Sequence, residues 1–383
     1  MEKVCGVICE YNPLHRGHAH HLERARALTG ADFVVCAMSG PFVQRGEPAI
    51  LDKWTRAQAA LLAGADLVLE LPALFAVRAA PDFAFGGAAL LAGLGVVTHL
   101  SFGAEDADLA HLTGLAAPES AEESARIRAY LEGGHSHPQA RALARGRQLP
   151  PNVTLGVEYL RALRRLGSGM EPVPVPRETA HNDERLHALS SATAVRRALA
   201  AGDEAGARQA LPPEAADLQL RALPQPLPAL SSFSSILLYL LRTTPPEALR
   251  ERFAIAEGLE NRLCREALAA PSAEALLAAV QCRRYPAARL RRLLVQILLG
   301  LDAAAVRAHP APEYVRVLGF RKRAEPLLRA ISRQGSLPLV TKVADAPAGG
   351  LLSLDLAAQD VWDLAAGHPG RRDFTERLRI LAD

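Results

Sequence analysis

Residues 6–18 read GVICEYNPLHRGH, and this stretch decides the fold. The apolar run Val4–Cys9 has the length and continuous hydrophobicity of a strand buried on both faces of a parallel sheet. Asn12-Pro13 is typical of a turn, and a helix is predicted from about Gly17 to a terminal glycine, Gly30. Ligands of open α/β sheets bind beyond the carboxyl ends of the strands, so a binding site is expected at this turn.

Two histidines, His15 and His18, stand three residues apart where the predicted helix begins, so both can reach one face. The free N–H groups and the dipole of a helix N-terminus attract anions, and imidazoles can donate hydrogen bonds to phosphate oxygens. Gly17 leaves room for a nucleotide near the backbone. We therefore predict that the pair stabilises charge developing on an α-phosphate and on a departing pyrophosphate.

Other interpretations of these histidines exist. Without context, two histidines with this spacing are more often surface or packing residues, and the strand, the turn and the glycine are what favour phosphate binding. His20 and His21 are consistent with the same site and equally with an exposed helix face. No metal site is predicted, because no third ligand of matching spacing is evident for zinc.

Working outward from this stretch, further apolar runs of strand length alternate with helical stretches. The predicted strands are Phe33–Met38, Leu67–Leu71 and Val96–Phe102, and the predicted helices are 17–29, 52–63 and 82–92. This alternation predicts an α/β fold with a doubly wound parallel sheet of the Rossmann type.

The chain divides into three predicted parts. Residues 1–205 form the α/β domain, in which the polar segment 105–150 is a helical insertion or connector. Residues 206–228 are rich in proline and are predicted to be a linker. Residues 229–383 are predicted to form a mainly helical domain, with one strand-like piece at Leu337–Val343.

Composition narrows the class of protein. Hydrophobic residues make up 49% of the 383 residues and charged residues 22%, so a large core can form. The net charge of +3 is too small to indicate a polyanionic partner. The five cysteines lack zinc-like spacing and are expected to be reduced thiols. We expect a cytoplasmic protein without a membrane segment, because neither a signal peptide nor an apolar run of spanning length is evident.

The H-x-G-H pattern after a first strand resembles the signature of the nucleotidyltransferase superfamily, to which class I aminoacyl-tRNA synthetases and small adenylyltransferases belong. The second half of that signature is a helix start rich in hydroxyl groups with a basic residue, and residues 190–196, SSATAVR, resemble it. Ser191, Thr193 and Arg196 are therefore predicted to hold the triphosphate. The alternative for Ser190 and Ser191 is ordinary N-capping of a helix.

A closer resemblance extends over nearly the whole chain. The segments that carry it are 6–18, 38–49, 52–56, 64–72, 101–105, 151–152, 156–160 and 257–262. They resemble the bacterial tRNA(Met) cytidine acetate ligase family. The resemblance implies that ATP and acetate form acetyl-adenylate and pyrophosphate. The acetyl group then passes to N4 of the wobble cytidine 34 of elongator tRNA(Met), and AMP is released.

The family's ATP contacts are carried over by position. They fall on Val7, Ile8, Cys9, Glu10, Tyr11, Asn12, Pro13, Leu14, His15, Arg16, Gly17, His18, Ala19, His20, Gly103, Asn152 and Arg177. The sequence departs from the family at Leu14, where phenylalanine is usual, and at Arg16, where asparagine is usual. Magnesium is expected to accompany ATP, although no set of acidic ligands is evident.

The polar loop from Ser39 to Arg56 is a second candidate element of the site. We hypothesise that it closes over the acyl-adenylate and meets the incoming cytidine, with Lys53 as a catalytic residue. The alternative is an irregular surface loop in which Asp52 caps a helix.

Residues 283–329 carry eleven basic and three acidic side chains, an excess far above the chain average. The predicted tRNA-binding residues in this segment are Arg283, Arg284, Arg289, Arg291, Arg292, Arg321, Lys322 and Arg323. Tyr285 and Tyr314 could stack on bases. The alternative is a solvated helix face whose arginines pair with acids elsewhere.

Two other functions compete with the tRNA ligase. A small-molecule adenylyltransferase of the coenzyme-precursor type would share the histidine motif, but such chains are usually shorter and lack a basic helical domain. A non-catalytic nucleotide- or RNA-binding protein would not need both His15 and His18. The acetate pocket, the residues that read the anticodon and the oligomeric state do not follow from the sequence.

Overall fold

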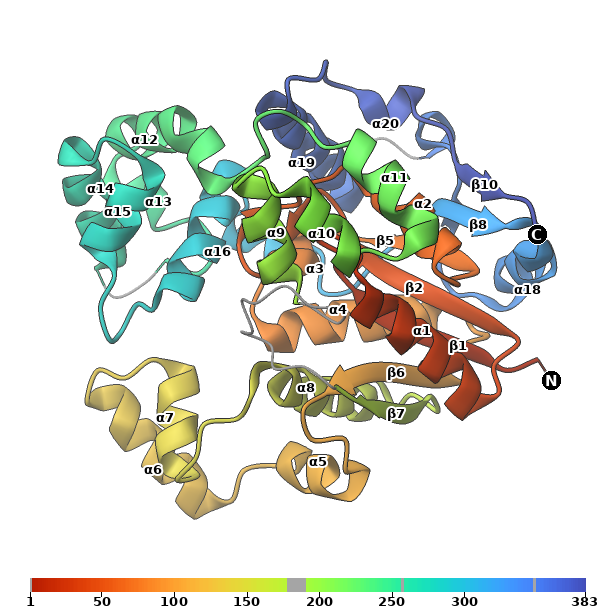
Figure 1. The fold of residues 1–383 in the computed structure, drawn as a ribbon. Coiled ribbons are helices and arrows are strands. Elements are labelled where there is room, and N and C mark those ends of the chain that lie inside the picture. The colour runs from red at the N-terminus through yellow and green to blue at the C-terminus, as the bar shows by residue number, and fades with distance from the viewer. Residues whose placement is uncertain (1, 178–190, 256–257, 347–348) are drawn as a thin grey trace.

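The computed structural model describes residues 2–177, 191–255, 258–346 and 349–383. A mixed, mostly parallel sheet lies at its centre, with helices on both faces (Figure 1). Along the sheet the strands are β10 (Arg379–Leu381), β8 (Val315–Arg321), β5 (Leu67–Leu71), β2 (Phe33–Ser39), β1 (Val4–Cys9), β6 (His99–Ala104) and β7 (Glu171–Pro176). β9 (Leu339–Val340) pairs with β8, and β3 (Phe42–Val43) and β4 (Glu47–Pro48) form a separate small hairpin. The predicted doubly wound sheet is confirmed.

Alternation within each strand explains why the apolar runs are continuous. In β1, Val4 and Ile8 pack on one face of the sheet, while Cys5 and Val7 pack on the other. The first face is covered by α3 (Ala73–Ala76), α4 (Ala80–Gly93) and α8 (Pro151–Leu166). The second is covered by α1 (Arg16–Thr29), α2 (Lys53–Leu62) and α11 (Pro213–Arg221). A strand covered on both sides needs apolar residues at every position.

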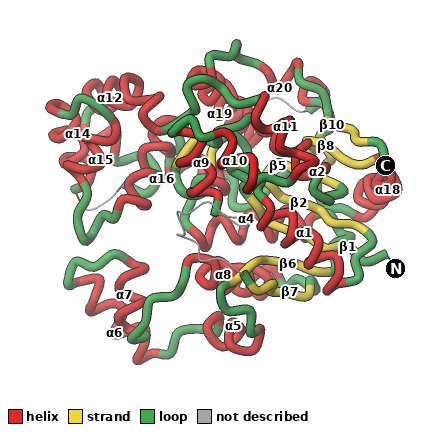
Figure 2. The backbone as a smooth tube through the Cα atoms, viewed as in Figure 1, coloured by secondary structure: helices red, strands yellow, loops and turns green. Residues whose placement is uncertain are grey.

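The remaining helices fall into three runs along the chain, and Figure 2 shows all helices in red. The first run is α5 (Leu109–Ala116), α6 (Ala121–Glu132) and α7 (His137–Ala144), within the predicted insertion. The second is α9 (Ala192–Ala200) and α10 (Glu204–Ala210), followed by η1 (Leu230–Phe233), α12 (Ser234–Thr243), α13 (Pro246–Leu249), α14 (Leu259–Ala269), α15 (Ala273–Val280), α16 (Ala287–Leu298) and α17 (Ala303–Ala308). The third is η2 (Lys322–Ala324), α18 (Glu325–Gln334), η3 (Val343–Asp345), α19 (Gly350–Ala366) and α20 (Arg372–Thr375).

The C-terminal part of the chain differs from the predicted helical domain. Residues 315–321 form β8, which pairs antiparallel with β5 and extends the central sheet. This strand was missed because its partner lies some 250 residues earlier in the chain, a pairing that local sequence does not reveal. The domain boundaries at 205 and 228 stay a prediction.

The predicted linker at 206–228 also needs correction. It contains α11, whose Ala215 is buried against the second face of the sheet. Its Gln219 binds the backbone of Leu14 through two hydrogen bonds of 3.0 Å. Pro212 and Pro213 lie at the start of α11, where proline is tolerated, and Pro224, Pro226 and Pro228 lie in the short stretch between α11 and η1. No helix in the described part of the chain is both long and apolar enough to cross a bilayer.

Candidate active site

The turn between β1 and α1 sets the chemistry of both histidines. His15 is the N-cap of α1, and its Nδ1 accepts a hydrogen bond from the backbone N–H of Gly17 at 3.1 Å. The Nδ1 of His18 accepts one from the backbone N–H of His15 at 3.3 Å. Because both Nδ1 atoms are acceptors, the proton of each neutral ring is on Nε2. The turn therefore prepares two Nε2–H donors.

The two imidazole rings are stacked, with 3.6 Å between their centroids and an angle of 26° between their planes. Tyr11 packs beside them, 4.9 Å from the ring of His18. Gly17 makes this arrangement possible, since a Cβ atom there would lie only 3.0 Å from Cε1 of His15. The glycine thus makes room for a histidine ring as well as for a ligand.

Burial holds the histidines in the neutral form. It lowers the pKa of His15 to about 3, with smaller contributions from the charges of Arg177 and Arg196. The pKa of His18 is lowered well below its ordinary value for the same main reason, with further contributions from His15 and Arg177. Two neutral donors beside two guanidinium groups form a site for an anion.

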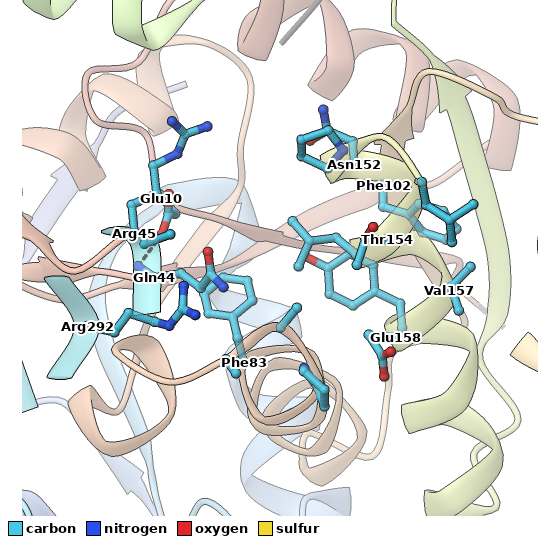
Figure 3. Close-up of a pocket in the computed structure, with 18 of the residues that line it drawn as sticks. Glu10, Gln44, Arg45, Phe83, Phe102, Asn152, Thr154, Val157, Glu158 and Arg292 are labelled. Carbon is cyan, nitrogen blue, oxygen red and sulfur yellow. Dashed lines mark hydrogen bonds between the residues drawn. The ribbon is translucent and has the colours of Figure 1, made fainter. Parts of the chain in front are cut away.

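A cavity of about 1710 Å³ opens at this turn, and residues from most of the chain line it. Figure 3 shows Asn152, Thr154 and Phe102 on one side and Glu10, Gln44, Arg45 and Arg292 on the other. The cavity also reaches α7 and the start of α16. The cavity therefore extends from the carboxyl edge of the sheet to α7 on one side and to the start of α16 on the other.

Most of the predicted ATP-binding residues lie in the wall of this cavity. These are Val7, Ile8, Cys9, Glu10, Tyr11, Asn12, His15, Gly17, His18, His20, Gly103, Asn152, Arg177, Ser191, Thr193 and Arg196. Pro13, Leu14, Arg16 and Ala19 are not among its lining residues. Leu14 is fully buried in the core beneath the turn, and Arg16 donates to the carbonyl of Leu211 at 3.3 Å.

The second half of the motif, on α9, contacts the turn that carries the first half. Arg196 donates to the carbonyl of Asn12 at 2.7 Å, which links α9 to the turn. Ser191 is the N-cap of α9, and its side chain accepts from Ala194 at 3.2 Å, so the capping role anticipated for it is present. Ser190 lies outside the described residues. Residues far apart in sequence thus meet at the turn.

Arg177 lies at the end of β7, and Asn152 lies in the first turn of α8. The side-chain amide of Asn152 donates to Glu105 at 2.7 Å, and the same carboxylate accepts from the backbone N–H of Val153. Arg177 follows β7 directly and packs on Gly103, where a Cβ atom would lie 3.3 Å from its Cγ. Glu105 therefore orients the amide of Asn152 at the start of α8.

Lys53 does not lie in the cavity wall, which corrects the hypothesis of a catalytic role. Its side chain is fully buried, and its Nζ lies 2.8 Å from carboxylate oxygens of both Glu70 and Asp373. Arg316 joins the same cluster, 2.7 Å from Asp373. A buried ammonium group needs charged partners, and the ion pairs of Lys53 with Glu70 and Asp373 hold α2 against β5 and α20. From the loop 39–56, Gln44 and Arg45 line the cavity instead.

Two side chains that sequence reasoning missed hold the turn in place. Arg56 is fully buried and donates to the carbonyls of Glu10 at 2.7 Å and Ser39 at 2.9 Å. Gln219 holds Leu14 from the other side. No local signal identifies Gln219, because it lies 205 residues from Leu14. The loop 39–56 that contains Arg56 could be singled out by its density of polar residues.

The predicted tRNA-binding residues separate into two groups. Arg283, Arg284, Arg289 and Arg292 line the cavity. Arg291 lies beside them and pairs with Glu47 at 3.3 Å. Arg321, Lys322 and Arg323 lie instead at the end of β8 near Asp66, at the opposite edge of the sheet. Arg321 donates there to the carbonyl of Leu61, and Arg323 pairs with Asp66.

The two tyrosines proposed to stack on bases are both buried. Tyr314 donates its hydroxyl hydrogen to Asp355, and Tyr285 lies under the guanidinium of Arg289, 5.1 Å from its ring centroid. Their burial corrects the stacking prediction. In the described ranges, no group of three or more His, Cys, Asp or Glu side chains is arranged to hold a metal ion.

A mostly parallel sheet with a histidine pair at the first strand–helix turn, near Arg177 after β7 and Arg196 on α9, is the arrangement of a nucleotidyltransferase. In agreement, the family model described as HIGH Nucleotidyl Transferase matches residues 2–376. The tRNA(Met) cytidine acetate ligase of Thermoanaerobacter sp. (strain X514) is 35% identical over 383 residues, which cover 94% of this chain and 95% of that protein. That of Caldanaerobacter subterraneus subsp. tengcongensis is 36% identical, with 95% of each chain covered. The chain belongs to the tRNA(Met) cytidine acetate ligase family.

Solved structures agree with this assignment. Thermotoga maritima TmcAL in an apo form superposes with a TM-score of 0.92, and the form bound with alpha-thio ATP superposes with a TM-score of 0.90. Both are 30% identical in sequence, and the match covers 100% of each chain.

Proposed function

We propose that this protein is an ATP-dependent ligase that acetylates elongator tRNA(Met). It activates acetate as acetyl-adenylate and transfers the acetyl group to N4 of the wobble cytidine 34, which yields N4-acetylcytidine, AMP and diphosphate. The observation that carries the proposal is the stacked pair His15 and His18 in a cavity that is also lined by arginines of the region 283–292. One cavity then serves both a nucleotide and an RNA. The family assignment supports the choice of substrates.

The first step takes place at the turn. The carboxylate of acetate attacks the α-phosphate of ATP, and pyrophosphate leaves. The Nε2–H groups of His15 and His18 donate to phosphate oxygens whose charge grows in the transition state. Arg177 and Arg196 neutralise the leaving pyrophosphate, and Mg²⁺ entering with ATP would be held by the phosphate oxygens and would offset their charge. No covalent enzyme intermediate is needed.

The second step requires tRNA beside the adenylate. The arginines of α16 and the segment before it, Arg283, Arg284, Arg289 and Arg292, supply positive charge on one side of the cavity. α6 and α7 flank the other side of the opening, and Arg283 reaches across to donate to the carbonyl of Gly133 at 2.7 Å. We propose that the anticodon loop enters between α16 on one side and α6 and α7 on the other. We also propose that the reaction takes place in the cytoplasm, where tRNA is found.

A reconstitution experiment tests the function. The protein is incubated with ATP, acetate and unmodified elongator tRNA(Met), and the digested tRNA is analysed for N4-acetylcytidine by mass spectrometry. We expect the product only when all three substrates are present. Acetate-dependent pyrophosphate release without tRNA reports the adenylation step separately. Release of pyrophosphate with another acceptor and no acetylated tRNA would favour a small-molecule adenylyltransferase, and absence of both activities would refute the proposal.

A further inference from the structure

Acetyl transfer to cytidine releases a proton that the enzyme must accept. The N4 amino group of cytosine is a weak nucleophile, because its lone pair is delocalised into the ring. When N4 forms a bond to the acetyl carbon it carries a positive charge until it loses a hydrogen. A positioned base that takes this proton in the transition state typically accelerates such a step by about 10²–10⁴-fold. This reasoning rests on the proposed function.

Three acidic side chains line the cavity in the described part of the chain: Glu10, Asp82 and Glu158. Two of them are held in ion pairs. Asp82 lies 2.7 Å from Arg78, and Glu158 lies 2.7 Å from Arg161 and 3.4 Å from Arg141. A carboxylate in a close ion pair is a weaker proton acceptor, because the pair favours its charged form. Glu158 is therefore poorly suited to act as the base, and Asp82, whose pKa is raised by burial despite its ion pair, is held by Arg78 at the start of α4.

Glu10 is held differently. Its carboxylate accepts a hydrogen bond from the backbone N–H of Gln44 at 2.5 Å to Oε1. That contact fixes the orientation of the group, and no ion pair of Glu10 occurs among the described residues. Glu10 is partly accessible and lines the cavity. We infer that Oε2 is the oxygen that meets a ligand, since Oε1 is held by Gln44.

The position of Glu10 matches the path of the RNA. It follows the last residue of β1, so it stands at the strand end beside the turn that carries His15 and His18. Figure 3 places Glu10 with Gln44, Arg45 and Arg292 on one side of the cavity, and Asn152 on the other. Glu10 therefore stands next to the turn proposed to hold the adenylate, and on the same side of the cavity as Arg45 and Arg292.

The environment of Glu10 increases its basicity. Burial raises the pKa of the Glu10 carboxyl, and the hydrogen bond from Gln44 and the charges of Arg45, Arg196 and Arg56 offset this effect only in part. His15 and His21 are poorer bases in this setting, since burial lowers the pKa of His15 to about 3 and that of His21 to about 4. A carboxylate with a raised pKa is better matched to accepting a proton near neutral pH.

We propose that Glu10 is the general base of the acetyl-transfer step. The N4 lone pair of cytidine forms a bond to the acetyl carbon of acetyl-adenylate. The bond between that carbon and the phosphate oxygen breaks, and AMP leaves with the electron pair. One N4 hydrogen passes as a proton to the Glu10 carboxylate, which later releases it to water, so atoms and charge balance without a further reactant.

The test separates the two steps in the full-length protein. Acetyl-adenylate is first formed on the enzyme, and transfer to unmodified tRNA(Met) is then followed in a single turnover from pH 4.5, the ordinary pKa of a glutamate, to pH 8.5. In the wild type the transfer rate is expected to rise with pH and to level off once Glu10 is ionised. Glu10→Gln is expected to lower the ratio of the transfer rate to the adenylation rate by about 10²-fold or more and to remove this pH dependence.

Two variants complete the design. Asp82→Asn makes the same chemical change at an ion-paired acid of the same cavity, and its pH profile of transfer is expected to match the wild type. Glu10→Asp keeps a carboxylate, and is expected to recover part of the transfer rate together with the pH dependence. It also provides the readout if the glutamine variant does not fold.

Each outcome bears on a distinct claim. A wild-type protein that forms neither acetyl-adenylate nor N4-acetylcytidine would refute the proposed function. If the wild type is active, and Glu10→Gln transfers acetyl at the wild-type rate with the wild-type pH profile, Glu10 is not the base. Equal loss of both steps in Glu10→Gln, with no recovery in Glu10→Asp, would also overturn the proposal and assign Glu10 to the architecture of the turn.

Discussion

At the scale of single residues, two backbone N–H groups determine what the histidines can do. By donating to Nδ1 of His15 and His18, they leave a hydrogen on each Nε2. Asparagine at position 15 keeps the helix cap, because its side-chain oxygen can accept from Gly17, but it loses the Nε2 donor. His15→Asn therefore separates capping from catalysis.

We predict that His15→Asn lowers the rate of acetate-dependent pyrophosphate release by about 10²–10³-fold, the usual cost of one transition-state donor. The unfolding midpoint at pH 7 should change little, because the cap is retained. Pyrophosphate release and urea unfolding of the same preparation measure the two effects. Wild-type activity in a correctly folded variant would mean that His15 does not contact the reacting phosphate.

The low pKa of His15 also predicts an acid-sensitive fold. The folded protein binds a proton at this residue only near pH 3, whereas the unfolded chain does so near 6.5. The unfolded chain thus binds more protons between these values, and the free energy of unfolding should fall as pH falls from about 6.5 towards 3. Urea unfolding at pH 7, 6, 5 and 4 should show a shallower decline for His15→Asn than for the wild type. An equal decline would assign the acid sensitivity to other groups.

At the scale of secondary-structure elements, α16 joins the two halves of the site. A hairpin turn packs against it so closely that a Cβ atom on Gly46, whose φ is +77°, would lie 2.2 Å from the backbone nitrogen of Arg292. Glu47 of the same hairpin lies 3.3 Å from Arg291 on α16 and 3.8 Å from Arg196 on α9. The helix that presents the arginines is therefore fixed relative to the nucleotide site.

For this element we predict that Arg289→Ala combined with Arg292→Ala weakens tRNA binding and makes it less dependent on salt. Each arginine–phosphate interaction that is lost should reduce the magnitude of the slope of log K against log salt by about 0.7–0.9, so the double variant should show up to about twice that change. Lys322→Ala is the matched control, since this exposed lysine lies at the opposite edge of the sheet and should leave the affinity unchanged. Filter binding at several salt concentrations measures both. The reverse result would move the RNA surface to the region around Lys322.

At the scale of the whole molecule, the C-terminal segment completes the core of the N-terminal domain. β8 pairs with β5, and a buried cluster of Lys53, Glu70, Arg316 and Asp373 joins α2, β5, β8 and α20. Trp362 of α19 is fully buried and donates to the carbonyl of Ala49 at 2.7 Å. The C-terminal segment from β8 onward is thus part of the structure that holds the loop 39–56.

We predict that Lys53→Met lowers the free energy of unfolding by about 3 kcal/mol, because it leaves buried carboxylates without their ammonium partner. The adenylation rate per folded molecule should stay close to that of the wild type. Lys342→Met, which removes an exposed pair with Asp345, should cost less than about 1 kcal/mol. Urea unfolding and active-site titration measure these effects, and a stable but inactive Lys53→Met would restore the catalytic hypothesis.

The sequence by itself determined the local features of this protein. Buried strands, helix caps such as Asp52 and the histidine turn depend on neighbouring residues, so their patterns predicted the α/β sheet and placed His15 and His18 at one strand end. Only the tertiary structure decided which distant residues meet. Three features depend on contacts between residues that are far apart in the chain: the antiparallel pairing of β8 with β5, the burial of Lys53, and the hydrogen bonds between Gln219 and Leu14. Such contacts are selected by the packing of the whole core, and a charged side chain looks the same in sequence whether it faces a ligand or a buried partner.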